Sequence, residues 1–234
     1  MSDLTGVERA KYVQNMFGRI AKRYDLLNRL NTFGQDLRWR KEAIRHLAIE
    51  PNTAVLDLGS GTGDIALEIA GKHLEVSVVA CDFTSEMILV GRERPGAEKV
   101  SWVIADAQFL PFAKECFSGT ISGFLLRNVP EVDRTLQEQK RVLKTGGRIA
   151  ALDTTPPRKN LLYPLINLHL NVIVPLLGKL IAGDEEAYTY LPSSTEKFLT
   201  AELLAERFKT VGFSQGGFVR RMLGTIAIHW GRKS

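Results

Sequence analysis

Apolar and polar positions follow two different spacings along this chain. Between Val13 and Leu27, apolar residues recur every three or four positions, and basic residues fall between them. This spacing predicts an amphipathic helix near the N-terminus. A second helix is expected over Asp36–Leu47.

From Thr53 onward, short apolar runs alternate with helical stretches. The runs predict five buried strands: Ala54–Leu58, Val76–Cys81, Val100–Ala105, Thr120–Leu126 and Arg148–Leu152. Helices are predicted between them over Asp64–Ala70, Ser85–Arg94 and Glu131–Lys144, with the last ended by Gly146–Gly147. Such alternation is typical of an α/β fold whose mostly parallel central sheet carries helices on both faces. Continuous apolar strands fit burial on both faces of that sheet.

The segment after Pro156–Pro157 is strongly apolar. Leu161–Ala182 is long enough to span a bilayer, but two prolines and several polar side chains interrupt it. These interruptions argue against a transmembrane helix and favour a buried or interfacial helix pair broken near Pro175. A helix over Thr200–Val211 and strands over Phe213–Val219 and Thr225–Trp230 should close the fold, with an antiparallel C-terminal strand.

No interdomain linker interrupts the chain, so a single domain is expected. Its parts are a helical lid over 1–50, a cofactor-binding core over 51–155, an apolar substrate-side insertion over 156–200 and a closing helix with strands over 201–234.

Composition and charge say little about the binding partners of the protein. The chain of 234 residues has 31 basic and 26 acidic residues and a net charge of +5. The basic residues are dispersed, without the aromatic-interleaved basic stripe expected for single strands, so no nucleic-acid partner is predicted. The two cysteines and four histidines form neither a metal-ligand motif nor a disulfide framework, and no metal is expected. A start without a signal peptide favours a cytoplasmic protein.

The strongest motif is a glycine loop, Gly59-Ser60-Gly61-Thr62-Gly63, between the first predicted strand and the next helix. In open parallel sheets, ligands bind beyond the carboxyl ends of the strands. A dinucleotide fingerprint requires glycine at its first, third and sixth positions, and here the sixth position is Asp64. The Lys-Ser/Thr pair of a phosphate-binding P-loop is also missing. An acid at this helix start suits a ligand with an amino group better than a pyrophosphate.

Acidic residues follow the next two strands. Asp82 lies roughly twenty residues past the glycine loop, where an acid binds ribose hydroxyls in such folds. Asp106, next to Ala107, ends the third strand, where a carboxylate can meet an adenine amino group. Three successive strand ends therefore predict one converging nucleoside site.

This arrangement resembles the class I methyltransferases across roughly Thr53–Leu152. The resemblance implies a Rossmann-like fold and S-adenosyl-L-methionine as the cofactor. The cofactor-binding residues that it implies are Asp57, Gly59, Gly61, Thr62, Gly63, Asp82, Phe83, Asp106, Ala107 and Gly123.

Three further segments resemble the ubiquinone/menaquinone biosynthesis C-methyltransferase family. They are the run from Met16 to Asn28 with its continuation from Gly34 to Arg40, the run Leu126-Arg127-Asn128-Val129, and the run from Tyr188 to Ser194. Departures from the family pattern are Gly123-Phe124-Leu125 where Ser-Phe-Gly is common, Pro130-Glu131 where an Asp is usual, and Asp153 where Glu is usual.

The second resemblance implies methylation of a ring carbon in a reduced polyprenyl quinol, and demethylmenaquinol is favoured. A cation beside the developing phenolate would stabilise it, and Arg127 is the candidate. Asn128 would orient the hydroxyl or a water, and no histidine base is evident, so a water relay is expected. The expected pocket residues are Tyr24, Asn28, Tyr188 and Tyr190. The apolar insertion and the positive charge together predict that this cytoplasmic protein contacts a membrane surface transiently, as a peripheral protein.

Several alternatives stay open at this point. They are a nicotinamide oxidoreductase, which the misplaced third glycine disfavours, a non-catalytic cofactor-binding regulator, and a methyltransferase of RNA or of another small molecule. The sequence also leaves open a benzoquinol against a naphthoquinol substrate, the tail length, and the oligomeric state, including a homo-oligomer.

Overall fold

The structure is a computed structural model that describes the chain except for residues 1–5, 159–160, 162, 175 and 177–184. Two helices precede the sheet, α1 (Gly6–Asn31) and α2 (Asp36–Leu47). The next elements are β1 (Ala54–Leu58), α3 (Asp64–Lys72), β2 (Ser77–Asp82), α4 (Ser85–Arg92), η1 (Ala97–Lys99), β3 (Val100–Ile104), β4 (Phe117–Gly123), α5 (Val132–Val142) and β5 (Leu143–Thr154). The C-terminal part holds α6 (Tyr163–Leu168), the π-helical η2 (His169–Ile173), α8 (Glu185–Lys197), α9 (Ala201–Val211), β6 (Phe213–Arg221), η3 (Met222–Gly224) and β7 (Ile226–Lys233).

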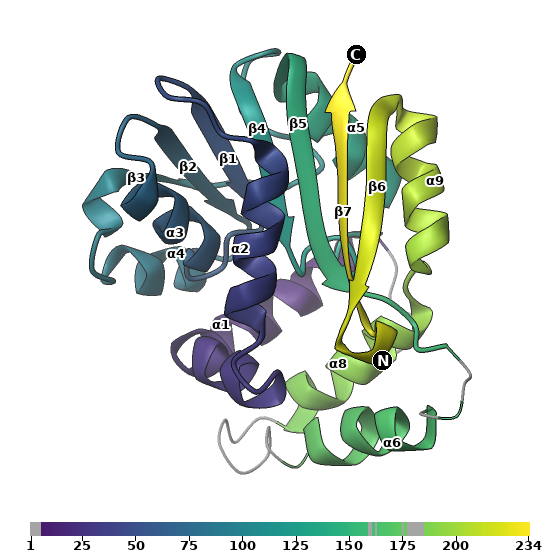
Figure 1. Cartoon of the computed structure of the whole chain (residues 1–234). Coiled ribbons are helices and arrows are strands. Elements are labelled where there is room, and N and C mark those ends of the chain that lie inside the picture. The colour runs from purple at the N-terminus through teal and green to yellow at the C-terminus, as the bar shows by residue number, and fades with distance from the viewer. Residues whose placement is uncertain (1–5, 159–160, 162, 175, 177–184) are drawn as a thin grey trace.

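Seven strands form one twisted sheet in the order β3-β2-β1-β4-β5-β7-β6 (Figure 1). The first five strands in that order are mutually parallel, whereas β7 runs antiparallel to both β5 and β6. The strand order reverses between β1 and β4, and such a switch point opens a crevice at the carboxyl ends of the strands. The predicted fold class is confirmed, including the antiparallel C-terminal strand.

The sheet is buried on both faces because alternate residues of each strand point to opposite sides. Val55 of β1 packs with α2 and α3 in one apolar cluster, whereas Leu56 and Leu58 belong to a cluster on the other face. In β5, Ile149 and Ala151 pack toward α5 and α9. Helices therefore cover both faces, as the continuous apolar runs predicted.

The junction between α5 and β5 differs from the prediction. The predicted helix Glu131–Lys144 ends two residues earlier, and β5 already begins at Leu143 and runs through both glycines. Leu143 pairs with Phe117 and Arg148 with Gly119, so the residues between them bulge out of the ladder. A Cβ on Gly147 would lie 2.8 Å from the Lys144 carbonyl oxygen. These glycines permit the bulge instead of ending the helix.

The fourth strand is also shifted relative to the prediction. It was expected over Thr120–Leu126, but β4 ends at Gly123. Phe124 has a φ of 62°, a left-handed conformation that bends the chain away from the sheet. The Arg127–Asn128 segment consequently lies in the turn after β4 and not in a strand.

The apolar segment is partly described. A helical stretch covers α6 and η2, whereas Pro175, where a break was predicted, lies outside the described residues, as do residues 177–184. Within the described ranges, no helix is both long and apolar enough to cross a membrane. Helix α8, which contains Pro192, was not predicted from the sequence.

Candidate active site

The glycine loop leaves β1 and returns as α3, and it rests on the neighbouring strand. The amide N–H groups of Gly59 and Ser60 both donate to the carbonyl of Cys81, at 2.8 and 3.1 Å. Gly59 has a φ of 65°, and a Cβ there would lie 2.7 Å from Leu125 Cδ1. At Gly63, with a φ of 87°, a Cβ would lie 2.4 Å from the Trp102 ring. Glycine is therefore required at both ends of the loop for conformation and for space.

Asp82 is fixed at the carboxyl end of β2 by backbone donors on both of its oxygens. Its Oδ2 accepts from the Gly61 amide at 2.7 Å and its Oδ1 from the Thr84 amide at 2.8 Å. Burial raises the pKa of Asp82, although these hydrogen bonds to the ionised form oppose the rise. Each oxygen keeps a further lone pair, so the carboxylate is a rigid acceptor for two vicinal hydroxyls.

Phe83, directly after β2, and Asp106, after β3, also belong to the pocket wall. Asp106 Oδ1 accepts from the Gln108 amide at 2.8 Å, and this contact fixes the carboxylate after β3. Phe83 is partly exposed, and its carbonyl accepts from Gln14 Nε2 at 2.9 Å. The hydrogen bond from Gln14 links α1 to the residue that follows β2.

Most of the predicted cofactor residues line a single pocket at the switch point. Its wall includes the predicted Gly59, Gly61, Asp82, Phe83, Asp106, Ala107 and Gly123, together with Tyr24 and Asn128. The sequence reasoning missed several wall residues, chiefly Val13, Gln14 and Phe17 from α1 and Thr84, Met87 and Gln108. Glycine backbone, a hydroxyl acceptor and an adenine-side carboxylate therefore converge as S-adenosyl-L-methionine requires.

Asp57, Thr62 and Gly63 lie behind the wall of this pocket. Gly63 packs against Trp102, and the Thr62 hydroxyl donates to Asp25 at 2.8 Å. Asp57 Oδ2 accepts from the Ala66 amide at 3.0 Å, while its Oδ1 finds no hydrogen-bond partner among the described residues. Burial raises the pKa of Asp57 to about 7.

Arg127 is buried in an ion pair in the turn after β4. Its Nη1 lies 2.6 Å from Asp153 Oδ1 at the end of β5, and its own amide donates to Asp153 Oδ2 at 3.2 Å. The guanidinium stacks over the Phe124 ring, 5.1 Å from its centroid. Its Nε is buried and has no hydrogen-bond partner in the described part of the chain. The result is a cation held in one orientation, with its buried Nε left as a donor without a partner among the described residues.

Asn128 links this turn to α8. Its Nδ2 donates to the Phe124 carbonyl at 2.9 Å, and its Oδ1 accepts from Tyr190 Oη at 3.2 Å. The Tyr190 ring in turn contacts Tyr12 of α1, with centroids 6.0 Å apart. Three segments far apart in sequence are therefore linked through Tyr190.

Tyr24 of α1 lines the cofactor pocket, whereas Asn28, one helical turn later, lines neither the pocket nor the neighbouring cleft. Burial raises the pKa of Tyr24, against the opposing influence of the Arg40 and Arg127 charges and of the Asn28 side chain. Asn28 Nδ2 is buried without a hydrogen-bond partner within the described ranges. The side chain of Tyr188 lies outside what the structure describes.

A second, larger cleft adjoins the first pocket. It has a volume of about 730 Å³ and shares Val129 and Pro130 with the pocket wall. Its cationic lining consists of Arg9, Arg127, Lys197 and Arg207, and Tyr12 and Tyr190 contribute aromatic rings. Arg127 lines the cleft and Asn128 the pocket, so this pair marks the boundary between two binding spaces.

Comparison with known proteins agrees with this geometry. Residues 5–233 match the model of the ubiE/COQ5 methyltransferase family. The "Ubiquinone/menaquinone biosynthesis C-methyltransferase UbiE" of Desulfotalea psychrophila is 44% identical over 94% of this chain and 90% of its own length. The "Demethylmenaquinone methyltransferase" of Thermus thermophilus is 39% identical over 92% of this chain and 99% of its own.

Solved structures show the same fold at low identity. The [4+2]-cyclase SpnF superposes with a TM-score of 0.67 at 16% identity, over 94% of both chains. A phosphoethanolamine methyltransferase of Haemonchus contortus, in complex with S-adenosylhomocysteine, gives a TM-score of 0.64 at 15% identity and covers 84% of this chain and 52% of its own. Family match, close relatives and site together establish that this chain belongs to the ubiE/COQ5 family and is an S-adenosyl-L-methionine-dependent methyltransferase.

Proposed function

We propose that the enzyme methylates a ring carbon of a reduced polyprenyl quinol, with a demethylmenaquinol as the preferred substrate. The names of the relatives support this substrate class, since "Demethylmenaquinone methyltransferase" recurs among them, including one from Desulfitobacterium hafniense that is 35% identical over the whole chain. Within this proposal, residues 1–50 act as a lid and 156–200 form the substrate side.

The chemistry requires the reduced ring. The bound cofactor supplies an electrophilic methyl group, so the accepting ring carbon must be electron-rich. A quinol oxygen that loses or shares its proton raises the electron density at the neighbouring carbon, whereas an oxidised quinone ring is itself electrophilic. A donor aimed at the developing phenolate oxygen lowers the barrier for this step.

The observation that carries the proposal is the buried Arg127 with its unpartnered Nε, at the boundary between the pocket and the cleft. Its pairing with Asp153 holds the guanidinium in one orientation, and the proposed role of this side chain is to donate to the substrate oxygen. A buried donor without a partner costs free energy, and a phenolate oxygen would remove that cost.

Asn128 is proposed to orient the quinol hydroxyl or the water that carries its proton. It lines the cofactor pocket and is held by Tyr190 and the Phe124 carbonyl. Tyr24, Asn28, Tyr188 and Tyr190 are proposed as walls around the ring.

Contact with a membrane surface is proposed through an exposed apolar face. From α1 and the following turn it includes Leu26, Leu30 and Phe33, and Phe33 stacks on His169 of η2 at 5.8 Å. The second half of the face comprises Leu161, Leu165, Leu168, Val172, Ile173 and Leu176. Exposed Lys22 and Arg23 flank it on α1, so an anionic bilayer suits both its charge and its apolar surface.

Flotation with anionic vesicles tests this surface. The native protein should float weakly, and high salt should reduce the bound fraction. At low salt, Phe33→Ser should float less than the native protein. Leu74→Ser, at an equally exposed leucine after α3, should float as the native protein does. Equal loss in both variants would contradict the assigned face.

The substrate is tested by incubating the enzyme with methyl-labelled cofactor and either a reduced demethylmenaquinol or a reduced benzoquinol precursor. Mass spectrometry should find the label on the naphthoquinol ring, and the oxidised quinones should stay unlabelled. Cofactor binding without label in either quinol would refute the proposed substrate class.

A further inference from the structure

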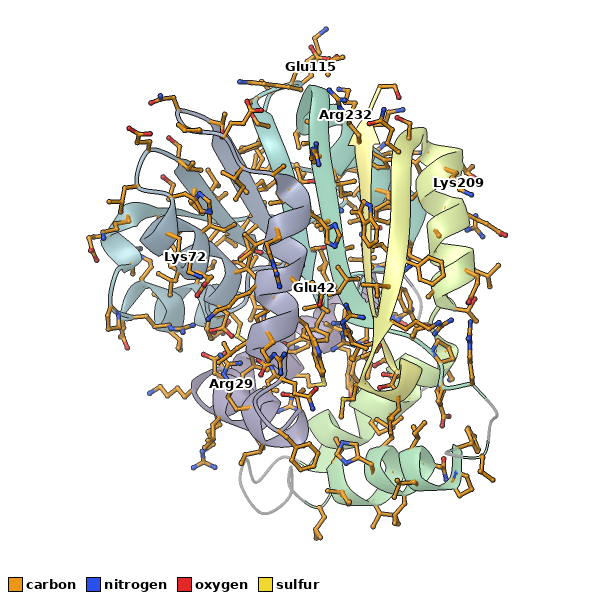
Figure 2. The ribbon with its side chains drawn as sticks, in the orientation of Figure 1. Arg29, Glu42, Lys72, Glu115, Lys209 and Arg232 are labelled. Carbon is orange, nitrogen blue, oxygen red and sulfur yellow. The ribbon has the colours of Figure 1, made fainter. Side chains whose placement is uncertain are left out.

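Helix α1 supplies one wall of the cofactor pocket. Val13, Gln14, Phe17 and Tyr24 of this helix face the strand ends that carry Asp82 and Asp106. The position of α1 relative to the glycine loop therefore determines the shape of the pocket. Arg29, near the C-terminal end of α1, is labelled in Figure 2, where it lies close to α2.

One link joins α1 to the glycine loop itself. The Thr62 hydroxyl lies 2.8 Å from both carboxylate oxygens of Asp25 in α1. Arg94, after α4, donates from Nη1 to the Thr62 carbonyl at 2.9 Å, and the same Nη1 lies 3.4 Å from Asp25 Oδ2. Helix, loop and the segment after α4 thus share one hydrogen-bonded group.

A second link runs through Asp64, the first residue of α3. Its Oδ2 pairs with Arg29 Nη2 of α1 at 2.7 Å, and its Oδ1 pairs with Arg94 Nη2 at 2.9 Å. Arg40 Nε of α2 lies 3.4 Å away, and Arg29 also pairs with Asp36. Asp64 has a side-chain exposure of only 5%, so this carboxylate is buried among cations.

The pKa values of the two carboxylates in these links, Asp64 and Asp25, depend on the charges around them. Burial by itself would raise the pKa of Asp64, but the Arg40 and Arg29 charges hold it below its usual value. In contrast, burial and the neighbouring Asp64 raise the pKa of Asp25, which the Thr62 hydroxyl and Arg94 only partly oppose. Removal of Arg94 would leave two nearby carboxylates with less compensation.

We infer that Asp25, Arg29, Thr62, Asp64 and Arg94 form an anchor whose role is to hold α1 over bound S-adenosyl-L-methionine. None of the five residues lines the cofactor pocket, so they are positioning residues. The anchor preorganises the wall that Phe17 and Tyr24 form, and preorganised walls improve affinity without new contacts. This inference rests on the cofactor-dependent activity and is independent of the quinol proposal.

The test is Arg94→Ala, with Arg92→Ala as the matched control at an exposed arginine at the end of α4. Calorimetry with S-adenosylhomocysteine should show an affinity loss of about tenfold in Arg94→Ala, equivalent to about 1.4 kcal/mol, and none in Arg92→Ala. Stopped-flow should show faster release of the ligand. The KM for the cofactor should rise while kcat at saturation stays within about threefold, a split expected of a positioning residue.

A double-mutant cycle across the Thr62–Asp25 contact tests the inference if Arg94→Ala fails to fold. Thr62→Val and Asp25→Ala should each weaken S-adenosylhomocysteine binding, and the double variant should be no weaker than the worse single variant, because both remove one shared contact. Additive losses would contradict a shared link. Folded variants with native affinity and native release rate would overturn the inference.

Discussion

The two halves of the active site are held together in different ways. On the cofactor side, the polar groups are fixed by backbone amides: Asp82 accepts from the Gly61 and Thr84 amides, and Asp106 accepts from the Gln108 amide. On the other side, Arg127 depends on Asp153, and Asn128 depends on Tyr190, which is 62 residues away. Backbone groups at the strand ends fix the first half, whereas side-chain contacts between distant elements hold the second.

This difference predicts that substitutions in the two halves change different quantities. Changes at the strand ends should alter cofactor affinity, whereas changes at the Arg127–Asn128 boundary should alter turnover. A substitution that changed both equally would remove the distinction.

The largest expected effect is that of Arg127→Ala. Loss of the donor to the developing phenolate should lower turnover of the reduced quinol by about a hundredfold or more, with little change in cofactor affinity. Arg127→Lys should recover only part of the rate, since an ammonium cannot reproduce the planar fork held by Asp153. Steady-state kinetics with calorimetry checks both. Near-normal turnover in folded Arg127→Ala would make the Asp153 pair purely structural.

Asp82→Ala tests the opposite half of the site. It removes the charged acceptor that orders the Gly61 and Thr84 amides and that should bind the ribose. Cofactor affinity should fall about thirtyfold, from loss of about 2 kcal/mol for a charged hydrogen bond. The KM for the quinol, measured at saturating cofactor, should stay within about twofold. A quinol defect as large as the cofactor defect would contradict the proposed division.

Asp57→Asn sharpens the comparison by pH dependence. Burial raises the pKa of Asp57 to about 7 in the folded protein, above the unfolded value of about 3.9. The folded state therefore binds more protons between those pH values, so its stability falls as the pH rises from about 4 to about 7 and then levels off. Asp57→Asn should lack this loss of about 1.4 kcal/mol per pH unit. Its Tm relative to the native protein should therefore increase by about 8 °C between pH 5 and pH 8, at about 3 °C per kcal/mol. A difference in Tm that does not change with pH would show that Asp57 does not titrate there.

The smallest expected effect is that of Tyr190→Phe. It removes the hydroxyl that donates to Asn128 Oδ1 and keeps the ring against Tyr12. Turnover should fall a few-fold, as expected for a hydrogen bond worth about 1 kcal/mol, with native cofactor affinity. Tyr163→Phe, in α6, is the control. A change in cofactor affinity without a change in turnover would place Tyr190 in the wrong half.

The same contrast explains what could be predicted from the sequence. The strands and the glycine loop were predicted because their signals are local: an apolar run, a turn and an acid within a few residues. The N-terminal cap of α9 is equally local, since Thr200 Oγ1 accepts from the Leu203 amide at 3.3 Å. The lining of the pocket by Gln14 and Phe17 depends on where α1 packs, which the spacing of its apolar residues does not specify.

Thr62 shows, at a single residue, what the sequence does not predict: the direction of a side chain. Its place in the glycine loop suggested a cofactor contact, but its hydroxyl donates to Asp25, 37 residues earlier in the chain. The direction of that side chain is set by the packing of α1. The start of β5 was missed for a related reason, because two consecutive glycines serve equally well to end a helix or to form a bulge.

The bulge in β5 has a practical consequence for engineering. Lys144 and Thr145 protrude from the ladder, and Arg232 Nε donates to the Gly146 carbonyl at 3.1 Å. Figure 2 labels Glu115 and Arg232 at this end of the sheet, opposite the strand ends that carry the site. Exposed irregular segments of this kind tolerate inserted sequence. A fluorescent reporter or an affinity tag placed between Lys144 and Thr145 would leave both binding spaces clear.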